Sequence, residues 1–486
     1  MRRMTKRAVL LFAIAAAMLL SVPQNAYAQS TLTGALPDGA TYLIEVPAHW
    51  NGTLLLYSHG YVTPGSANPA RDVGDPGTRL FLLANGFALA GSSYATTGWA
   101  IHEALPDQIA VLDVFNVHFS SPHRTIAWGH SLGGIITAGL IQRFPDRFDA
   151  ALPMCGVLSG GVATWNQALD GAFAFQTLQA FGSGLQVVHI TNPAANFLIS
   201  EQQLAAAQAT PQGRARIALA AALGDTPGWF DAASPEPAAT DFAARELNQF
   251  LWFQQVDFPF IFSLRAELEF RAGGNPSYNT QINYREQLEH SVNRAEVKAL
   301  YQAAGLSLDA DLETLEDAAR IHADAAAVDY LSQNIIFNGK IRIPVLTLHT
   351  SGDGLVSVQN ESAYEDVVDE AGRGRLLRQT FVHRAGHCTF TPAETITALQ
   401  ALLARLDTGR WPDTDPGTLN AAAATLGPLN VAPPSFFKLN PGPFLRPFDL
   451  GDEHCAGGVE GDCRDRHERH DRDRGDHDRD DHGDRD

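Results

Sequence analysis

The 486-residue sequence has few cysteines and, beyond its first 28 residues, no long hydrophobic run. No later stretch reaches the roughly 18 consecutive apolar residues that a membrane-spanning helix needs, so stable membrane insertion is not expected. No internal repeat stands out, so the chain is not expected to be a repeat protein. The formal net charge of −19 argues against nucleic acid or an anionic membrane as a binding partner.

Residues 1–28 have the pattern of a secretory signal peptide. Four basic side chains precede an apolar stretch from Ala8 to Val22, and Ala26-Tyr27-Ala28 forms an A-x-A cleavage site. We therefore expect an exported protein, either periplasmic or secreted, with an uncleaved anchor as the alternative. The four cysteines of an exported chain allow two disulfides in three pairings, and Cys455 and Cys463 could close a small loop.

The C-terminal part of the chain is poor in regular patterns. Residues 409–450 are rich in Pro and Gly and are predicted to wrap the core as extended chain. Residues 451–486 are predicted to be disordered, because from Arg464 onward Arg, Asp and His alternate without any apolar residue. Histidines among these carboxylates could bind a divalent metal weakly; the alternative is a solvated tail that only increases solubility.

Short apolar strands alternate with helical segments in two separate parts of the chain. The predicted strands cover residues 53–58, 87–92, 124–128, 150–155, 344–349 and 376–382. This alternation is typical of βαβ units. It predicts an α/β fold with a mostly parallel central sheet flanked by helices, formed by residues 29–156 and 341–408.

The intervening residues 157–340, here named the helical insertion, lack any buried-strand signal. They are rich in Ala, Gln and Leu and contain helical runs, so we expect an inserted α-helical lid. An aromatic cluster lies within it, and these rings are expected to form the core of the lid or, alternatively, to line an acyl or aromatic pocket. The cluster consists of Phe250, Trp252, Phe253, Phe258, Phe260 and Phe262.

The motif Gly129-His130-Ser131-Leu132-Gly133 lies between a predicted strand and a predicted helix. A serine at such a tight turn adopts a strained backbone conformation that exposes its hydroxyl, and neighbouring glycines avoid steric clashes. The new helix directs unpaired N–H groups toward the serine. The pattern predicts that Ser131 is a nucleophile; the alternative is a glycine-rich packing turn.

A strand ending in His59-Gly60-Tyr61 is followed by an irregular loop. An oxyanion hole is built at such a strand end, with one backbone N–H from the loop and one from the residue after the serine. We expect the N–H groups of Tyr61 and Leu132 to be these donors; an ordinary βα loop is the alternative.

An acid and a base follow later strands in the order Ser131, Asp353, His387. Catalytic groups gather at the carboxyl ends of the strands in open α/β sheets. A serine hydroxyl needs a nearby base, and the base needs an acid that fixes its tautomer. We assign His387 as the base and Asp353 as the acid, with His349 and His383 as rival bases. No metal and no cofactor are expected.

These residues resemble the α/β-hydrolase fold family over about residues 40–156 and 341–406. The elbow around Ser131, the oxyanion strand end at His59-Gly60, the acid turn at Ser351-Gly352-Asp353 and the histidine loop at Gly386-His387 carry the resemblance. It implies covalent serine chemistry and a cap after the nucleophile-bearing half. The chain departs from the family pattern in lacking an extended His-Gly-Gly-Gly.

Cys388 directly follows the predicted base, a placement similar to that in feruloyl esterases and tannases. Those enzymes pair such a cysteine with one beside the serine, whereas here His130 and Leu132 flank Ser131. Cys155 ends the next strand, so a bridge from Cys155 to Cys388 could brace the histidine loop; separate buried thiols are the alternative.

The sequence thus predicts an exported serine hydrolase that cleaves a small-molecule or polymeric carboxylic ester through an acyl-enzyme. The alternatives are an exopeptidase or amidase of the same fold and a non-catalytic binding protein. An exopeptidase would need a charged group in the helical insertion to hold a free amino terminus, for which Glu267, Glu269 and Glu286 are candidates.

Overall fold

The computed structural model describes residues 28–448. Three predictions concern residues outside this range: the signal peptide, except for its last residue, the disordered tail, and a bridge between Cys455 and Cys463. In the described range, no helix combines the length and the apolar character that crossing a membrane requires.

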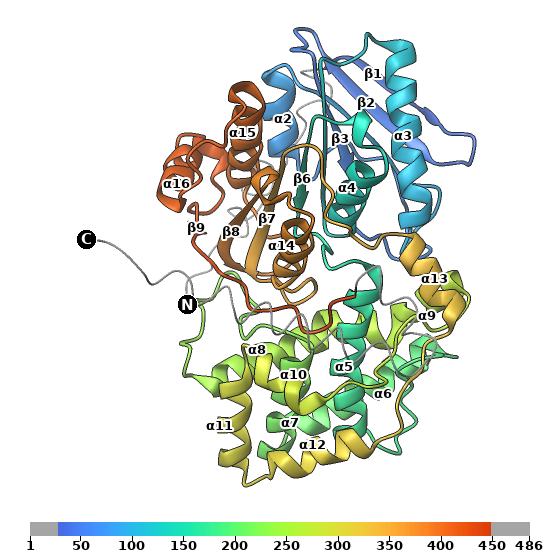
Figure 1. The fold of residues 1–486 in the computed structure, drawn as a ribbon, viewed down its shortest axis with the longest axis vertical. Helices are drawn as coiled ribbons and strands as arrows, with labels where there is room; N and C mark the ends of the chain where they lie inside the picture. The colour runs from blue at the N-terminus through green and yellow to red at the C-terminus, as the bar shows by residue number, and fades with distance from the viewer. Residues whose placement is uncertain (1–27, 449–486) are drawn as a thin grey trace, which may run out of the picture.

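A nine-stranded sheet forms the upper part of the molecule in Figure 1. Its strand order is β1-β2-β4-β3-β5-β6-β7-β8-β9. The six strands from β3 to β8 pair in parallel, whereas β1, β2 and β9 pair antiparallel at the two edges. The strands are β1 (Ala28–Ala35), β2 (Thr41–Pro47), β3 (Thr53–Ser58), β4 (Ala88–Ser92), β5 (Arg124–His130), β6 (Ala150–Met154), β7 (Val345–Gly352), β8 (Leu377–Ala385) and β9 (Phe436–Phe437).

Helices cover both faces of this sheet, which explains its continuous apolar strands. Along β3, Leu54 and Leu56 face a core that includes α3, α4 and α14, while Leu55 and Tyr57 face a second core that includes α2, α15 and α16. These helices are α2 (Pro76–Ala84), α3 (Ile101–His118), α4 (Leu132–Arg143), α14 (Asn360–Glu370), α15 (Pro392–Thr408) and α16 (Pro416–Ala424), with short 3-10 turns η1 (Pro145–Arg147), η4 (Gly374–Leu376) and η5 (Gly427–Leu429).

The chain leaves the sheet after β6 and returns to it at β7. Between these strands lie the helices of the lower part of Figure 1. Most pack around a separate apolar core, in which Ala220, Ala221 and Ala222 of α7 are fully buried, so the alanine-rich sequence serves close helix packing. The elements are α5 (Gly161–Gln179), α6 (Pro193–Gln208), α7 (Pro211–Leu223), α8 (Phe242–Trp252), η2 (Phe253–Asp257), η3 (Phe260–Leu264), α9 (Arg265–Ala272), α10 (Tyr284–His290), α11 (Arg294–Ala304), α12 (Leu308–Asp317) and α13 (Ala325–Gln333).

Residues 409–450, which were predicted to be extended chain, differ from that prediction because they contain α16, η5 and the short edge strand β9. Pro416 occupies the first turn of α16, where its missing N–H costs no intrahelical hydrogen bond. After β9 the chain passes between the sheet and the helical insertion (Figure 1). There Arg446 donates to the buried Asp170 of α5 at 2.6 Å and to the Tyr278 carbonyl at 2.7 Å, which fastens this segment to the insertion.

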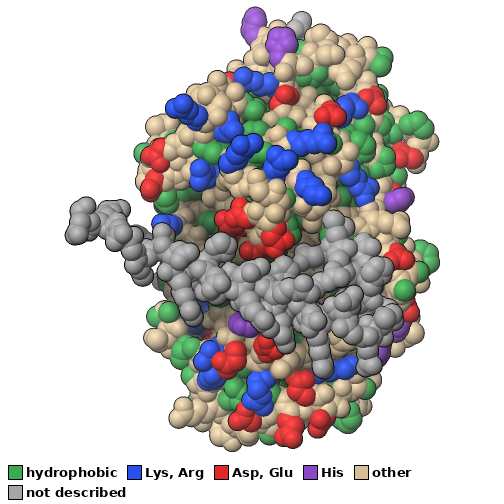
Figure 2. All heavy atoms as spheres, in the orientation of Figure 1, with side chains coloured by type: hydrophobic (Ala, Val, Ile, Leu, Met, Phe, Trp, Pro, Cys, Tyr) green, Lys and Arg blue, Asp and Glu red, His purple; other side chains and the backbone are tan. Residues whose placement is uncertain are grey.

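Charged side chains are distributed unevenly over the surface. In the view of Figure 2, Lys and Arg side chains gather over the sheet-containing part, whereas Asp and Glu side chains are scattered over both parts. On this face the positive charge is therefore concentrated on the sheet-containing part, although the chain as a whole is negatively charged.

Candidate active site

The turn from β5 into α4 places Ser131 at the N-cap of the helix with φ 59° and ψ −124°. Positive φ is uncommon for a residue with a side chain and marks local backbone strain at functional turns. The turn also lies tightly against β3, because a Cβ atom on Gly133 would come within 1.9 Å of the Ser58 carbonyl oxygen. Glycine is therefore required there, which gives the Gly-x-Ser-x-Gly pattern its physical reason.

The predicted oxyanion donors lie beside this serine. Tyr61, Ser131 and Leu132 line one pocket, and a Cβ on Gly60 would lie 3.3 Å from the Ser131 Cβ. His59 Nδ1 donates to the Gly60 carbonyl at 2.7 Å, which fixes the planar peptide to which the Tyr61 N–H belongs. Within residues 28–448, neither the Tyr61 N–H nor the Leu132 N–H donates a hydrogen bond, so both are available.

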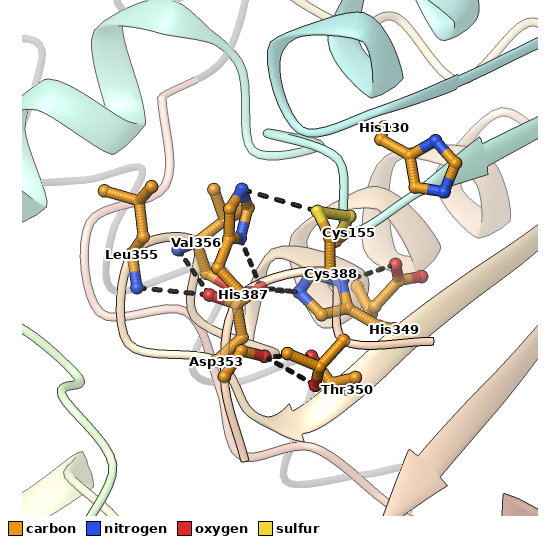
Figure 3. Close-up of a disulfide and its surroundings, with 12 residues drawn as sticks. His130, Cys155, His349, Thr350, Asp353, Leu355, Val356, His387 and Cys388 are labelled. Atoms are coloured by element: carbon orange, nitrogen blue, oxygen red, sulfur yellow. Dashed lines mark hydrogen bonds and ion pairs between the residues drawn. A yellow bond between two sulfur atoms is a disulfide. The ribbon is translucent and has the colours of Figure 1, made fainter. Parts of the chain in front are cut away.

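Asp353 follows β7 and His387 follows β8, and the two side chains meet (Figure 3). His387 Nδ1 donates to Asp353 Oδ2 at 2.7 Å. Burial would raise the pKa of Asp353, but the charge of His387 and hydrogen bonds from His349 and His387 outweigh it and hold the pKa below its ordinary value. The backbone N–H groups of Leu355 and Val356 donate to Oδ1, so both carboxylate oxygens are engaged.

The two rival bases lie elsewhere. His349 is fully buried behind Asp353, with Nδ1 3.0 Å from Glu361 Oε1 and Nε2 2.9 Å from the Val356 carbonyl. His383 lies on the surface, where it pairs with Glu236 at 2.8 Å. Neither lines the pocket that contains Ser131.

The structure brings together only part of the predicted triad. In the described chain, a hydrogen bond joins Asp353 to His387, but none joins His387 to Ser131. His387 Nε2 instead lies 3.4 Å from Cys388 Sγ. Catalytic hydrogen bonds are often long or poorly aligned without substrate, so this geometry does not rule out His387 as the base.

A disulfide joins Cys155 to Cys388 (Figure 3), which answers the question that the sequence left open. The register of β5 and β6 pairs His130 with Met154, so Cys155 directly follows the partner of the residue before the serine. The bridge therefore ties the histidine loop to the strand end beside Ser131. The bridged sulfurs near His387 are not thiolates, so this group of residues is not a metal site.

The pocket beside Ser131 lies between the sheet and the helical insertion. Three rings of the aromatic cluster, Phe253, Phe258 and Phe260, line it, and Phe260 packs edge-on against Tyr61 with centroids 5.1 Å apart. Phe253 and Phe258 also belong to the apolar core of the insertion, so these two rings both form that core and line the pocket.

The glutamates considered for an amino terminus do not line this pocket. Glu267 accepts from the Arg271 side chain and from the backbone N–H of Trp99, and Glu269 accepts from the Arg265 side chain. The acidic residue that does line the pocket is Asp257, which sequence reasoning missed because no motif marks it.

Comparison with known proteins identifies the family of this chain. Residues 95–169 match the prolyl oligopeptidase family. An o-phthalyl amidase of Xanthobacter agilis is 33% identical over 421 residues, which are 80% of this chain and 90% of that protein. The chain belongs to the α/β-hydrolase family. The predicted resemblance and the predicted mostly parallel sheet flanked by helices are therefore confirmed.

Solved structures similar to this α/β-hydrolase share little sequence with it. An esterase from Aspergillus oryzae has a TM-score of 0.43 at 12% identity and covers 79% of this chain and 80% of its own. Feruloyl esterase B from the same organism has a TM-score of 0.39 at 12% identity, covering 79% and 82%. An acylaminoacyl peptidase of Pyrococcus horikoshii has a TM-score of 0.36 at 10% identity, covering 84% and 45%.

Removal of the disulfide tests its role in the site. Replacing both Cys155 and Cys388 by Ser is expected to lower the free energy of unfolding by about 2–5 kcal/mol. Hydrolytic kcat is expected to fall more than tenfold, because the loop carrying His387 is released. Denaturant unfolding and steady-state kinetics measure the two effects. The matched control replaces Cys455 and Cys463, and equal losses in both double variants would contradict this role.

The pKa of His349 makes stability depend on pH. Burial would lower this pKa, but hydrogen bonds and charges from Asp353 and Glu361 outweigh it and raise it to about 10 from 6.5. The stabilisation is fully present below about pH 6.5 and is lost as the pH rises through about 10. His349→Gln is therefore expected to lower the free energy of unfolding at pH 7 by about 3–5 kcal/mol and to flatten its decline toward pH 10.

Urea unfolding between pH 6 and pH 10 measures this effect. His383→Gln is the matched control on the surface and should change stability by less than about 1 kcal/mol. An unchanged pH profile in His349→Gln would show that the buried imidazole is not charged in the folded protein.

Proposed function

We propose that this α/β-hydrolase is an exported serine hydrolase that cleaves carboxylic esters through an acyl-enzyme on Ser131. The observation that carries the proposal is the hydrogen bond from His387 Nδ1 to Asp353 Oδ2 at 2.7 Å, at strand ends close to the strained Ser131 turn. A paired imidazole and carboxylate at the carboxyl ends of the strands supply the base that a serine hydroxyl needs.

The proposed reaction begins with transfer of the Ser131 hydroxyl proton to His387 Nε2 while Oγ attacks the ester carbonyl carbon. For this step the imidazole turns from Cys388 Sγ toward Oγ and keeps Nδ1 on Asp353. The N–H groups of Tyr61 and Leu132 stabilise the oxyanion. The alcohol leaves with the proton from His387, and a water activated by the same imidazole then releases the acid.

The proposal places the enzyme outside the cytoplasm, periplasmic or secreted. The disulfide between Cys155 and Cys388 supports this location, because such bridges persist in oxidising compartments. In the proposal the helical insertion acts as a lid, and the pocket beneath it accepts a small-molecule ester or the end of a polymer. In the proposal neither a metal nor a cofactor takes part, nucleic acid and anionic membranes are not partners, and the chain has no stable membrane insertion. The tail remains a candidate for weak divalent-metal binding.

Amide hydrolysis is the second candidate function. The relative that is 33% identical over most of the chain is named an o-phthalyl amidase, which favours amides. The proposed steps are the same, except that the leaving group that takes the proton from His387 is an amine instead of an alcohol. An exopeptidase is less well supported, because Glu267 and Glu269 already have partners that would compete with a free amino terminus.

Substitution of the proposed triad tests the mechanism. Ser131→Ala, His387→Ala and Asp353→Asn are each expected to lower kcat by about 10⁴-fold or more, because each removes a member of one catalytic unit. Steady-state ester hydrolysis measures this loss, with His383→Gln as a control that keeps the wild-type rate. Activity abolished by a chelator, together with failure of a fluorophosphonate to label Ser131, would contradict the mechanism.

A substrate panel separates the two candidate reactions. With matched acyl groups, nitrophenyl esters and nitroanilides differ only in the leaving group. The ester proposal predicts turnover of the esters without measurable cleavage of the nitroanilides, whereas an amidase would hydrolyse both. Faster cleavage of aminoacyl nitroanilides than of blocked anilides would instead favour an exopeptidase.

A further inference from the structure

One acidic side chain in the pocket has no role in the proposed triad. Asp257 is the last residue of η2, one of two π-helical turns within a helical stretch that runs from Phe242 to Ala272. Pro259 lies between these turns and lacks the N–H that an α-helix would use. Such π turns are rare and occur frequently at functional sites.

Asp257 is 6% exposed and lines the same pocket as Ser131. Phe253, Phe258 and Phe260 line the same pocket, so aromatic rings make up much of its wall. Among the described residues, Asp257 Oδ2 has no hydrogen-bond partner. An unpaired buried polar group destabilises the fold, so its retention in a largely apolar pocket requires an explanation.

Two other unpaired polar groups belong to the same lining. The indole N–H groups of Trp99 and Trp165 are buried and find no acceptor in the described part of the chain. Gln167, another polar side chain of the lining, donates to Asp225 at 2.7 Å. Both unpaired indole groups are hydrogen-bond donors, so their natural partner on a bound substrate is an acceptor.

The direction of the pKa shift of Asp257 fits the same pattern. Burial raises the pKa of this carboxyl well above its ordinary value, the negative charge of Asp353 raises it further, and a hydrogen bond with Thr226 offsets only part of the shift. A protonated carboxyl group carries an O–H and therefore donates, as the two indoles do.

We infer that Asp257 is a specificity-determining residue that donates a hydrogen bond to a carbonyl oxygen carried on the acyl group of the substrate. The inference rests on the proposed acyl-enzyme at Ser131 and deepens it by naming an aromatic acyl group with an additional carbonyl substituent. The phenylalanine rings of the lining contact the aromatic ring, and Asp257 selects the substituent. A site built to pair a polar group rejects analogues that leave the group unpaired.

The test uses two acyl groups of similar shape. Nitrophenyl benzoates carrying an acetyl group at the ortho, meta or para position are compared with the isopropyl analogues, which lack the carbonyl. In the wild type the best acetyl isomer is expected to exceed its isopropyl analogue by about tenfold in kcat/KM. Asp257→Asn should retain the preference because its amide donates, whereas Asp257→Leu and Asp257→Ala should reduce the ratio to near one.

The matched control is Glu246→Gln. Glu246 is another buried acid of the insertion with an unpaired oxygen, but it does not line the pocket, so the acetyl preference should persist in this variant. Binding of the corresponding benzoic acids, measured by calorimetry in the Ser131→Ala background, gives the same comparison without turnover. If the wild type were inactive and unlabelled by a fluorophosphonate, the proposed function would fail, while these affinities would still decide the role of Asp257.

Three results would overturn the inference. The first is an equal loss for acetyl and isopropyl substrates in Asp257→Leu, which would mean that Asp257 acts on the fold or on Asp353. The second is a wild-type preference for aminomethyl substituents that disappears in Asp257→Asn, which would indicate an ionised carboxylate that binds amines. The third is an acetyl preference that persists in both Asp257→Leu and Asp257→Ala.

Discussion

The hydrogen bond between Asp353 and His387 is the contact on which the rest of the site depends. It forms because β7 and β8 are parallel neighbours whose carboxyl ends meet at one edge of the sheet. The buried His349 stands behind Asp353, and its positive charge favours the ionised carboxylate. A carboxylate held in this state can orient the imidazole and stabilise its protonated form, which is what the proposed chemistry requires.

A disulfide and two ion pairs connect the Ser131 turn, the helical insertion and the C-terminal segment to the part of the sheet that carries this pair. The bridge from Cys155 to Cys388 fixes the loop carrying His387 beside the strand that neighbours the Ser131 turn. The insertion is attached to the sheet region through Arg271, which pairs with Glu103 of α3, and to the C-terminal segment through Arg446 and Asp170. The pocket is therefore formed between two parts that charged contacts hold together, with Ser131 on the wall from the sheet region and aromatic rings on the wall from the insertion.

The sequence predicted those features that depend on local chemistry. The glycines around Ser131 are required by the close approach of β3, and the apolar strands are continuous because both faces of the sheet are covered. The C-terminal ends of these strands then place Asp353 and His387 at one edge, as expected. Asp353 pairs with His387 as the chain order predicted, whereas no hydrogen bond joins His387 to Ser131 among the described residues.

Features that depend on tertiary contacts could not be predicted in this way. The role of Asp257 depends on two π turns whose register no residue pattern marks, and the pairing of Arg446 with Asp170 joins residues 276 positions apart. The helix α16 was missed because proline and glycine at its start suggested extended chain, although proline is well tolerated in a first helical turn. Glu267 and Glu269 were plausible ligands by charge alone, but tertiary contacts pair them with Arg271 and Arg265.

The central claim is that Ser131 carries the acyl group during turnover. Quenching the enzyme with acid during hydrolysis of a slow ester, followed by mass spectrometry of the intact chain and of its peptides, tests this claim most directly. An acyl-enzyme increases the mass of the chain by that of the acyl group, and the adduct is expected on Ser131 and absent from Ser131→Ala. An adduct on another residue, or steady turnover in Ser131→Ala, would contradict it.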